Sequence, residues 1–173
     1  ILALTFTNKA AREMKARIDR VVGEQEARNI WMGTFHSIFA RILRIEADRI
    51  NYPRDFTIYD TQDSKSLIKD IIKGMGLDDK VYKVNIVYGR ISNAKNNLIG
   101  PKDYANQTEI VSDDHQAGRP KMAEIYAKYA HRCYRAGAMD FDDLLFKTNE
   151  LLRDFPEVLL RYQHKFRYIL VDE

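Results

Sequence analysis

The hydrophobic positions of the chain form short continuous runs near both ends and helical stripes in between. Residues 1–6 and 29–33 are typical of strands, and each is followed by apolar residues at helical spacing. The stripes consist of Ala10, Met14, Ile18 and Val21 after the first strand, and of Phe35, Ile38, Phe39, Ile42 and Leu43 after the second. Two strand-helix units in succession predict an α/β core.

A third apolar run, from Ile169 to Val171, is followed directly by two acids. Because the run is continuous rather than alternating, it predicts a central parallel strand that is buried on both faces. The carboxyl edge of such a sheet is where open α/β folds bind ligands, so Asp172 and Glu173 are candidates for chemistry. The alternative is a strand that ends in two solvated acids, and the stretch alone favours this alternative.

Polar residues stand at the two junctions between strand and helix. Thr7 or Asn8 can cap the first helix, which leaves backbone amides at that junction free to meet a phosphate, and Thr34 can cap the second helix. Phe6 ends the first strand, where its ring can stack on a nucleic-acid base, although an isolated phenylalanine is more often part of the core. His36 lies in the first turn of the second helix and can reach the same edge, but a histidine there is usually just solvated.

Three segments of the sequence match known helicase motifs. The run LTFTNKAAREM from Leu4 to Met14, the run TFHS from Thr34, and the final VDE resemble superfamily 1 helicases of the UvrD, PcrA and Rep type. They are similar in order and spacing to the motifs called Ia, Ib and the start of II, and the first run is long enough to be quite specific. The resemblance implies an ATP-dependent DNA helicase that moves 3′ to 5′ along single-stranded DNA.

The resemblance also implies roles for individual residues. The first two motifs of the family line the track for single-stranded DNA. DNA contacts are therefore implied for Phe6, Asn8, Thr34 and His36. The acids of motif II serve ATP: by resemblance Asp172 holds Mg²⁺ through water, and Glu173 orients or deprotonates the attacking water. ATP and Mg²⁺ are thus the implied cofactors.

The stretch between the second and third strands is far longer than the dozen or so residues that one crossover needs. An inserted, mostly helical subdomain is therefore expected. The resemblance identifies the surrounding parallel sheet as part of a RecA-like motor domain of the P-loop NTPase type. We expect the first part of motor domain 1A at 1–50, the inserted subdomain 1B at 51–136, and the return to 1A at 137–173.

Apolar spacing predicts several helices within the insertion. Thr61 is expected to cap the first of them, and a second runs over 82–98 with Leu98 on its apolar stripe. Residues 102–119 are polar and mixed in charge, so we expect a mobile loop there. After a further amphipathic helix, Asp140 is expected to cap the helix that leads back to the motor domain.

The insertion also has a basic face. Lys65, Lys69 and Lys73 recur every four residues, and residues 62–102 hold eight basic against four acidic side chains, enough to neutralise a few phosphates. Arg90 lies on the polar face of the next helix and is a further candidate. In the family this subdomain lies near duplex DNA, whereas the residues alone favour a solvated lysine face.

Composition and charge limit which partners and covalent or metal sites the chain can have. The net charge of +3 and a pI near 8.9 favour an anionic partner only weakly. Cys133 is the only cysteine, so the chain can form neither an internal disulfide nor a cysteine-based zinc site, which fits the reducing cytoplasm. No apolar stretch approaches the roughly 18 residues of a membrane span, so no membrane partner is expected.

A Walker A loop of the form G-x-x-x-x-G-K-[ST] does not occur in the sequence, because no two glycines stand five positions apart. The sequence also begins inside an apolar run, so we expect a fragment of a longer helicase that does not hydrolyse ATP alone. Two other interpretations stay open. One is the motor part of a RecB-like or AddA-like helicase-nuclease, and the other is a non-catalytic nucleic-acid-binding module.

Overall fold

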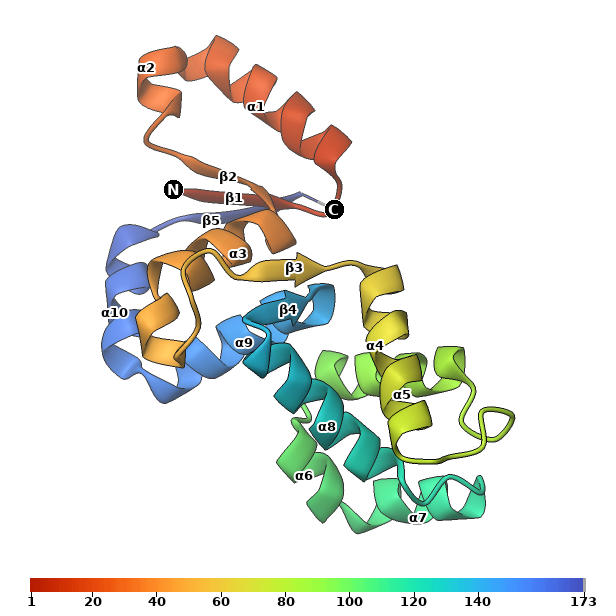
Figure 1. Ribbon diagram of the computed structural model, residues 1–173. Coiled ribbons are helices and arrows are strands. Elements are labelled where there is room, and N and C mark those ends of the chain that lie inside the picture. The colour runs from red at the N-terminus through yellow and green to blue at the C-terminus, as the bar shows by residue number, and fades with distance from the viewer. Residues whose placement is uncertain (173) are drawn as a thin grey trace. The chain divides into compact units, whose positions relative to one another are not determined.

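A computed structural model of the chain describes residues 1–172, with the exception of the Glu24 side chain. The chain forms two compact units (Figure 1), one made of Ile1–Arg54 and Lys147–Glu173 and the other of Asp55–Phe146. We refer to them as unit 1 and unit 2. Each has its own sheet and its own buried residues. None of the helices in the described part of the chain is both long and apolar enough to cross a membrane.

Unit 1 combines parallel strands with the helices that connect them. Its strands are β1 (Leu2–Thr5), β2 (Trp31–Thr34) and β5 (Ile169–Asp172). Its helices are α1 (Asn8–Val22), α2 (Glu24–Ala27), α3 (Phe35–Ile45), the 3₁₀ helix η1 (Ala47–Ile50), α10 (Pro156–Lys165), and α9 (Phe141–Asp154), which begins in unit 2. This mixture of parallel strands and helices confirms the predicted α/β class.

The sheet of unit 1 has the order β2-β1-β5. β1 is its buried centre, and Leu2, Ala3 and Leu4 are each at most 5% exposed. The prediction that residues 169–171 form a central strand buried on both faces is wrong, because β5 pairs only with β1 among the described residues and Ile169 is 60% exposed. The continuous apolar run therefore forms an exposed edge strand in this structure.

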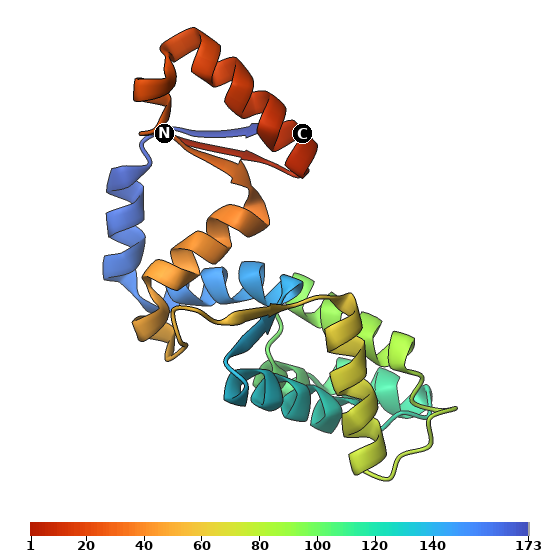
Figure 2. The ribbon, with the colours of Figure 1, turned by 45° about the horizontal axis from the view of Figure 1, so that its top comes forward.

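Helices lie on both faces of this sheet. α1 covers one face, while α3 and α10 lie on the other (Figure 1 and Figure 2). α3 buries Ile38, Ile42 and Leu43, as its apolar stripe predicts. Val21 of α1 is 83% exposed, so its predicted inward position is wrong. A helix of 15 residues is about 22 Å long and a strand of 4 residues only about 13 Å, which leaves the last turn of α1 without sheet beneath it.

Unit 2 is mostly helical and contains a short parallel strand pair. The strands are β3 (Thr57–Tyr59) and β4 (Ala138–Asp140), and the helices are α4 (Thr61–Gly74), α5 (Val84–Asn96), α6 (Pro101–Asn106), α7 (Thr108–Gln116), α8 (Met122–Arg135) and the start of α9. Its core includes Ile68, Ile71, Ile72, Val87, Ile91, Tyr104, Ile125, Tyr126, Tyr129 and the packed thiol of Cys133. The pairing of β4 with β3 lies within unit 2, which runs from Asp55 to Phe146.

The cap of α4 differs from the one that the sequence predicts. Asp60, not Thr61, is the N-cap: its Oδ1 accepts the Asp63 amide at 2.8 Å, and Asp63 Oδ2 accepts the Asp60 amide at 3.1 Å. This is a capping box, in which each side chain satisfies a backbone donor of the other residue. A carboxylate pair of this kind outcompetes the single hydroxyl of Thr61, so the helix begins at Thr61, one residue earlier than a Thr61 cap would place it.

The segment after α5 is more ordered than the sequence predicts. Residues 102–119 do not form a loop but fold into most of α6 and all of α7. Pro101 stands at the first turn of α6, where its fixed φ favours a helix start. Leu98 lies outside α5 with a φ of 58° and is 49% exposed, so its predicted place on the apolar stripe is wrong. The left-handed backbone at Leu98 ends the helix before the stripe can continue.

Candidate nucleic-acid and nucleotide site

The carboxyl ends of β1, β2 and β5 meet at one edge of the unit 1 sheet. In the parallel register, Thr5 lies between Thr34 of β2 and Asp172 of β5. α1 and α3 start directly after β1 and β2, so both helix starts lie at the same edge (Figure 1). We call this region the carboxyl edge. It is the edge at which parallel α/β sheets bind ligands.

Asp172 places an exposed carboxylate at the carboxyl edge. Glu173, the residue predicted to activate water, lies outside the described residues. Within residues 1–172, no group of three His, Cys, Asp or Glu side chains is arranged to hold a metal ion by itself. A single exposed carboxylate still suits Mg²⁺, because this ion keeps several waters and is usually bound through one or two carboxylates together with phosphate oxygens.

Phe6 is the most accessible aromatic group of the carboxyl edge, with 66% of its surface exposed. Its ring centroid lies 5.1 Å from that of Phe35, which in turn lies 6.0 Å from that of Phe39. Phe35 packs against one part of the Phe6 ring, while most of the Phe6 surface stays open to solvent. The structure thus leaves Phe6 out of the core, with most of its ring accessible.

Two threonines cap the helices that start at the carboxyl edge. Thr7 Oγ1 accepts the Ala10 amide at 3.1 Å, which identifies Thr7 rather than Asn8 as the cap of α1. Thr34 Oγ1 accepts the Ser37 amide at 3.2 Å, and Ser37 Oγ donates to the Thr34 carbonyl at 2.9 Å. A Cβ at position 33 would approach Ser37 Oγ to 2.7 Å, so any larger residue in the turn from β2 into α3 would require the Ser37 side chain to move.

The remaining two predicted DNA contacts flank these caps. Asn8 is the first residue of α1 and is exposed. His36 lies in the first turn of α3 and is half-buried. The structure therefore gathers all four predicted DNA-contact residues at the carboxyl edge, next to the strand that ends in Asp172.

The basic face of unit 2 is more mixed in charge than the sequence suggests. Lys69 and Lys73 are exposed, while the ammonium of Lys65 lies 5.5 Å from the centroid of the Tyr88 ring. Lys69, Lys73 and Lys83 line a hollow of about 630 Å³, but Asp78 and Asp79 line it too. The exposed lysines are accessible to a phosphate backbone, although the neighbouring acids lower the local charge.

The guanidinium of Arg90 is already hydrogen-bonded to other side chains within unit 2. Its Nε donates to Tyr104 Oη at 2.9 Å and to Asp114 Oδ1 at 3.1 Å, and the Asp114 side chain is only 6% exposed. Burial alone would lower the pKa of Arg90, but Tyr104 and Asp114 outweigh that effect and raise it. Arg90 therefore anchors α7 to α5. Its suggested contact with duplex DNA stays a prediction that this geometry does not favour.

A buried ionic cluster joins α5 to the start of α9. Lys95 Nζ lies 2.7 Å from Asp140 Oδ2 and 2.9 Å from Asp143 Oδ1, and Tyr129 Oη donates to Asp140 at 2.7 Å. Asp140 Oδ1 also accepts the Asp143 amide at 2.8 Å, which confirms that Asp140 caps α9. Burial alone would lower the pKa of Lys95, but the carboxylates of Asp143 and Asp140 raise it above its ordinary value. We call Lys95, Asp140, Asp143 and Tyr129 the lysine cluster.

Sequence reasoning missed this role of Lys95, although the sequence holds a signal for it. Val87, Ile91 and Lys95 follow each other at intervals of four residues, so Lys95 continues the buried stripe of α5. A lysine on an apolar stripe needs a buried acid as its partner. Asp140 and Asp143 supply it, but their distance in the sequence hides the pairing.

The whole chain, residues 1–173, matches the model of the UvrD/REP helicase N-terminal domain. The chain therefore belongs to this family of helicase domains. Among curated relatives, the ATP-dependent DNA helicase PcrA of Staphylococcus epidermidis is 49% identical over 173 residues. PcrA of Staphylococcus aureus is 48% identical over the same length. The alignments cover 100% of this chain and 23% of each relative, so the chain spans about a quarter of their length.

Proposed function

We propose that the chain is part of an ATP-dependent DNA helicase and that its carboxyl edge carries both a segment of the DNA track and half of the nucleotide site. The main support is the geometry of unit 1. Phe6 and Thr34 come from different strand-helix units, yet they lie at the same sheet edge as Asp172. The PcrA relatives are named ATP-dependent DNA helicases, and we propose the same activity for the protein that contains this arrangement.

In this proposal unit 1 is part of a RecA-like motor domain 1A, and unit 2 is the inserted subdomain 1B. The parallel sheet with helices on both faces is consistent with the motor assignment. The helical character of unit 2 and its position in the chain, between two segments of unit 1, support the assignment as an insertion.

The carboxyl edge would bind single-stranded DNA in two ways. Phe6 would stack on a base, which suits a motor that moves along any sequence because every base has a π-face. Asn8, Thr34 and His36 stand at helix starts, where side chains and backbone amides favour phosphate groups. Release of a base from Phe6 in each ATP cycle would then let the strand advance.

Asp172 would hold Mg²⁺ through water, and Glu173 would orient or deprotonate the water that attacks ATP. When bound, Mg²⁺ neutralises charge on the phosphate groups. The exposed position of Asp172 leaves its carboxylate free to accept from the water shell of the ion. The glycine-rich loop and the second motor domain of such a helicase would have to come from outside this sequence.

Duplex DNA is the second proposed partner. Lys69 and Lys73 would contact its backbone, because both ammonium groups are exposed on α4. Lys65 would contribute less, since it lies against the Tyr88 ring, and Arg90 least, because its guanidinium is held by Asp114.

The test is unwinding by the full-length protein that contains this chain. Two partial duplexes, identical except for a single-stranded 3′ or 5′ tail, are mixed with protein, ATP and Mg²⁺, and strand separation is followed by fluorescence. The proposal predicts ATP-dependent unwinding of the 3′-tailed substrate alone. Unwinding of neither substrate would contradict the helicase assignment, and unwinding from the 5′ tail would contradict the polarity.

A further inference from the structure

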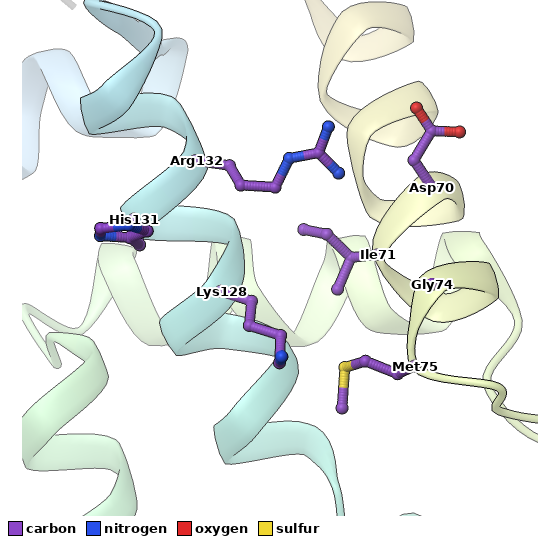
Figure 3. A pocket seen from close by; sticks show the side chains of 7 residues that line it. All are labelled: Asp70, Ile71, Gly74, Met75, Lys128, His131 and Arg132. Atoms are coloured by element: carbon purple, nitrogen blue, oxygen red, sulfur yellow. The ribbon is translucent and has the colours of Figure 1, made fainter.

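α4 and α8 of unit 2 border a groove of about 340 Å³ (Figure 3). The groove lies entirely within unit 2, and none of the proposed DNA or nucleotide residues lines it. Its volume falls at the lower end of the range of ligand pockets, large enough for one or two apolar side chains of a partner.

The floor of the groove is apolar and comes from α4. Figure 3 shows Ile71 and Met75 projecting from α4 toward α8. Ile71 is 4% exposed and belongs to the core, while Met75 is half-buried and packs against that core. Gly74 lies between them and adds no side chain, and a Cβ built there meets no atom within 4 Å. The groove therefore has open space above an adaptable apolar surface.

The opposite wall of the groove is cationic and comes from α8. Lys128 and Arg132 stand one helical turn apart, and both project toward α4 in Figure 3. Within residues 1–172, Arg132 has no ion-pair partner, and Lys128 has only Glu124 Oε1 at a distance of 3.8 Å. Asp70 also lines the groove but pairs with neither cation in the described part of the chain. Two positive charges thus face an apolar floor.

We propose that this groove binds an acidic, amphipathic segment of a partner protein. Apolar side chains of the segment would lie on Ile71 and Met75, and its carboxylates would pair with Lys128 and Arg132. Helices that place one face in an apolar groove are a common mode of peptide recognition. Because Lys128 and Arg132 are positive, the partner segment should be negatively charged, and this complementarity raises the association rate.

The apolar floor is the reason to favour a protein segment over a nucleic acid. A phosphate backbone needs cations and gains nothing from Ile71 or Met75, whereas a leucine or phenylalanine buries apolar area against them. Lys69, Lys73 and Lys83 line a separate hollow together with Ile72, Leu77, Asp78, Asp79 and Val84, and Lys69 and Lys73 are already part of the proposed DNA surface.

The probe is a fluorescein-labelled peptide with Leu and Phe at helical spacing and Glu and Asp at its other positions. Its binding to the 173-residue chain is measured by fluorescence anisotropy. We expect saturable binding that the double variant Lys128→Glu and Arg132→Glu weakens by about tenfold or more, because each reversal turns an attraction into a repulsion. The control Lys102→Glu makes one such reversal at an exposed position of α6, outside the groove, and should leave the affinity within about twofold.

A second variant tests the groove without changing any charge. Gly74→Trp fills the open space above Ile71 and Met75, and should weaken peptide binding by about tenfold or more. Gly74→Ala is its control and should bind as the unsubstituted chain does. Circular dichroism of each variant checks that the helices are intact.

A peptide that fails to bind, or one whose affinity is the same for the unsubstituted chain, the double charge variant and Gly74→Trp, overturns the proposal. A single-stranded oligonucleotide is titrated in parallel. If the double charge variant weakens the oligonucleotide about tenfold while the peptide does not bind, the groove contacts nucleic acid and the proposal is wrong. Loss of unwinding in the full-length protein with peptide binding intact would contradict the helicase proposal and leave this one standing.

Discussion

At the scale of single residues, exposure separates the side chains that can meet a ligand from those that hold the fold. Phe6 is 66% exposed beside the ring of Phe35, whereas Lys95 is 3% exposed between two carboxylates. An aromatic ring in water and a lysine in the core both depart from the usual preference of their residue types. The first departure is consistent with the proposed DNA contact of Phe6, and the second is explained by Asp140 and Asp143.

Phe6→Ala should weaken the binding of single-stranded DNA to the chain by about 1 to 3 kcal/mol, because the variant loses the stacking surface. Binding is measured by fluorescence anisotropy with a labelled oligonucleotide at several salt concentrations. The slope of affinity against salt should not change, since no phosphate contact is removed. Equal affinities for the variant and the unsubstituted chain at matched salt would contradict base stacking at Phe6.

Lys95→Met should lower the free energy of unfolding by about 3 to 5 kcal/mol, because it leaves the buried carboxylates of Asp140 and Asp143 without a counter-ion. Urea unfolding at pH 7 followed by circular dichroism measures the change. Lys102→Met is the control and should change the free energy by less than about 0.5 kcal/mol, since Lys102 is exposed. Equal losses in the two variants would show that the lysine cluster has no special role.

The loss of stability in Lys95→Met should depend on pH. Burial alone would raise the pKa of Asp140, but Lys95 holds it below its ordinary value of 3.8, so this contribution to stability is present above pH 3.8 and is lost as the pH falls further. Without Lys95, burial raises the pKa of the carboxyl groups, which then protonate at a milder pH. The deficit of Lys95→Met should therefore be smaller at pH 4.5 than at pH 7. A deficit that stays constant would argue against an electrostatic origin.

At the scale of elements, local capping signals decide where helices begin. Asp60 and Asp63 form a capping box on α4, Thr7 caps α1, and Thr34 caps α3. The cap at Thr34 was predictable from the strand-helix pattern, which narrowed the cap of α1 to Thr7 or Asn8. The cap of α4 was not, since Asp60 and Thr61 are adjacent and both are good caps.

Asp60→Ala should destabilise the chain by about 1 kcal/mol, because the start of α4 loses its side-chain acceptor. Thr61→Ala should have little effect, as Thr61 is exposed and does not cap the helix. Both changes are measured by urea unfolding, with Asp60→Asn as a variant that keeps the cap. A larger loss for Thr61→Ala than for Asp60→Ala would contradict the structural assignment of the cap.

Elements that depend on distant partners were harder to predict. Residues 102–119 have no strong apolar period, and α7 is held through the buried Asp114 to Arg90 on another helix. β4 is a strand of 3 residues that exists because it pairs with β3. β5 was predicted as a strand correctly, but its burial depends on neighbours on both sides, and periodicity does not report them.

At the scale of the whole molecule, the motifs identify a family, and the structure arranges them at one place. The match of residues 1–173 to the UvrD/REP helicase N-terminal domain confirms the resemblance that the sequence suggests. Phe6, Thr34 and Asp172 could be placed at a common edge from the sequence, because parallel strands bring their carboxyl ends together. The ion pairs of Arg90 and Lys95 could not be predicted from the sequence, because their partners are distant along the chain.

The most direct test of the account is ATP hydrolysis by the full-length protein that contains the chain, measured with and without single-stranded DNA for the unsubstituted protein and for Glu173→Gln. The account predicts that DNA stimulates hydrolysis, and that the variant loses about a hundredfold or more of the rate because a general base is gone, while a fluorescent ATP analogue still binds. Hydrolysis by Glu173→Gln at the unsubstituted rate would contradict the assignment of this sheet edge to an ATP-driven motor.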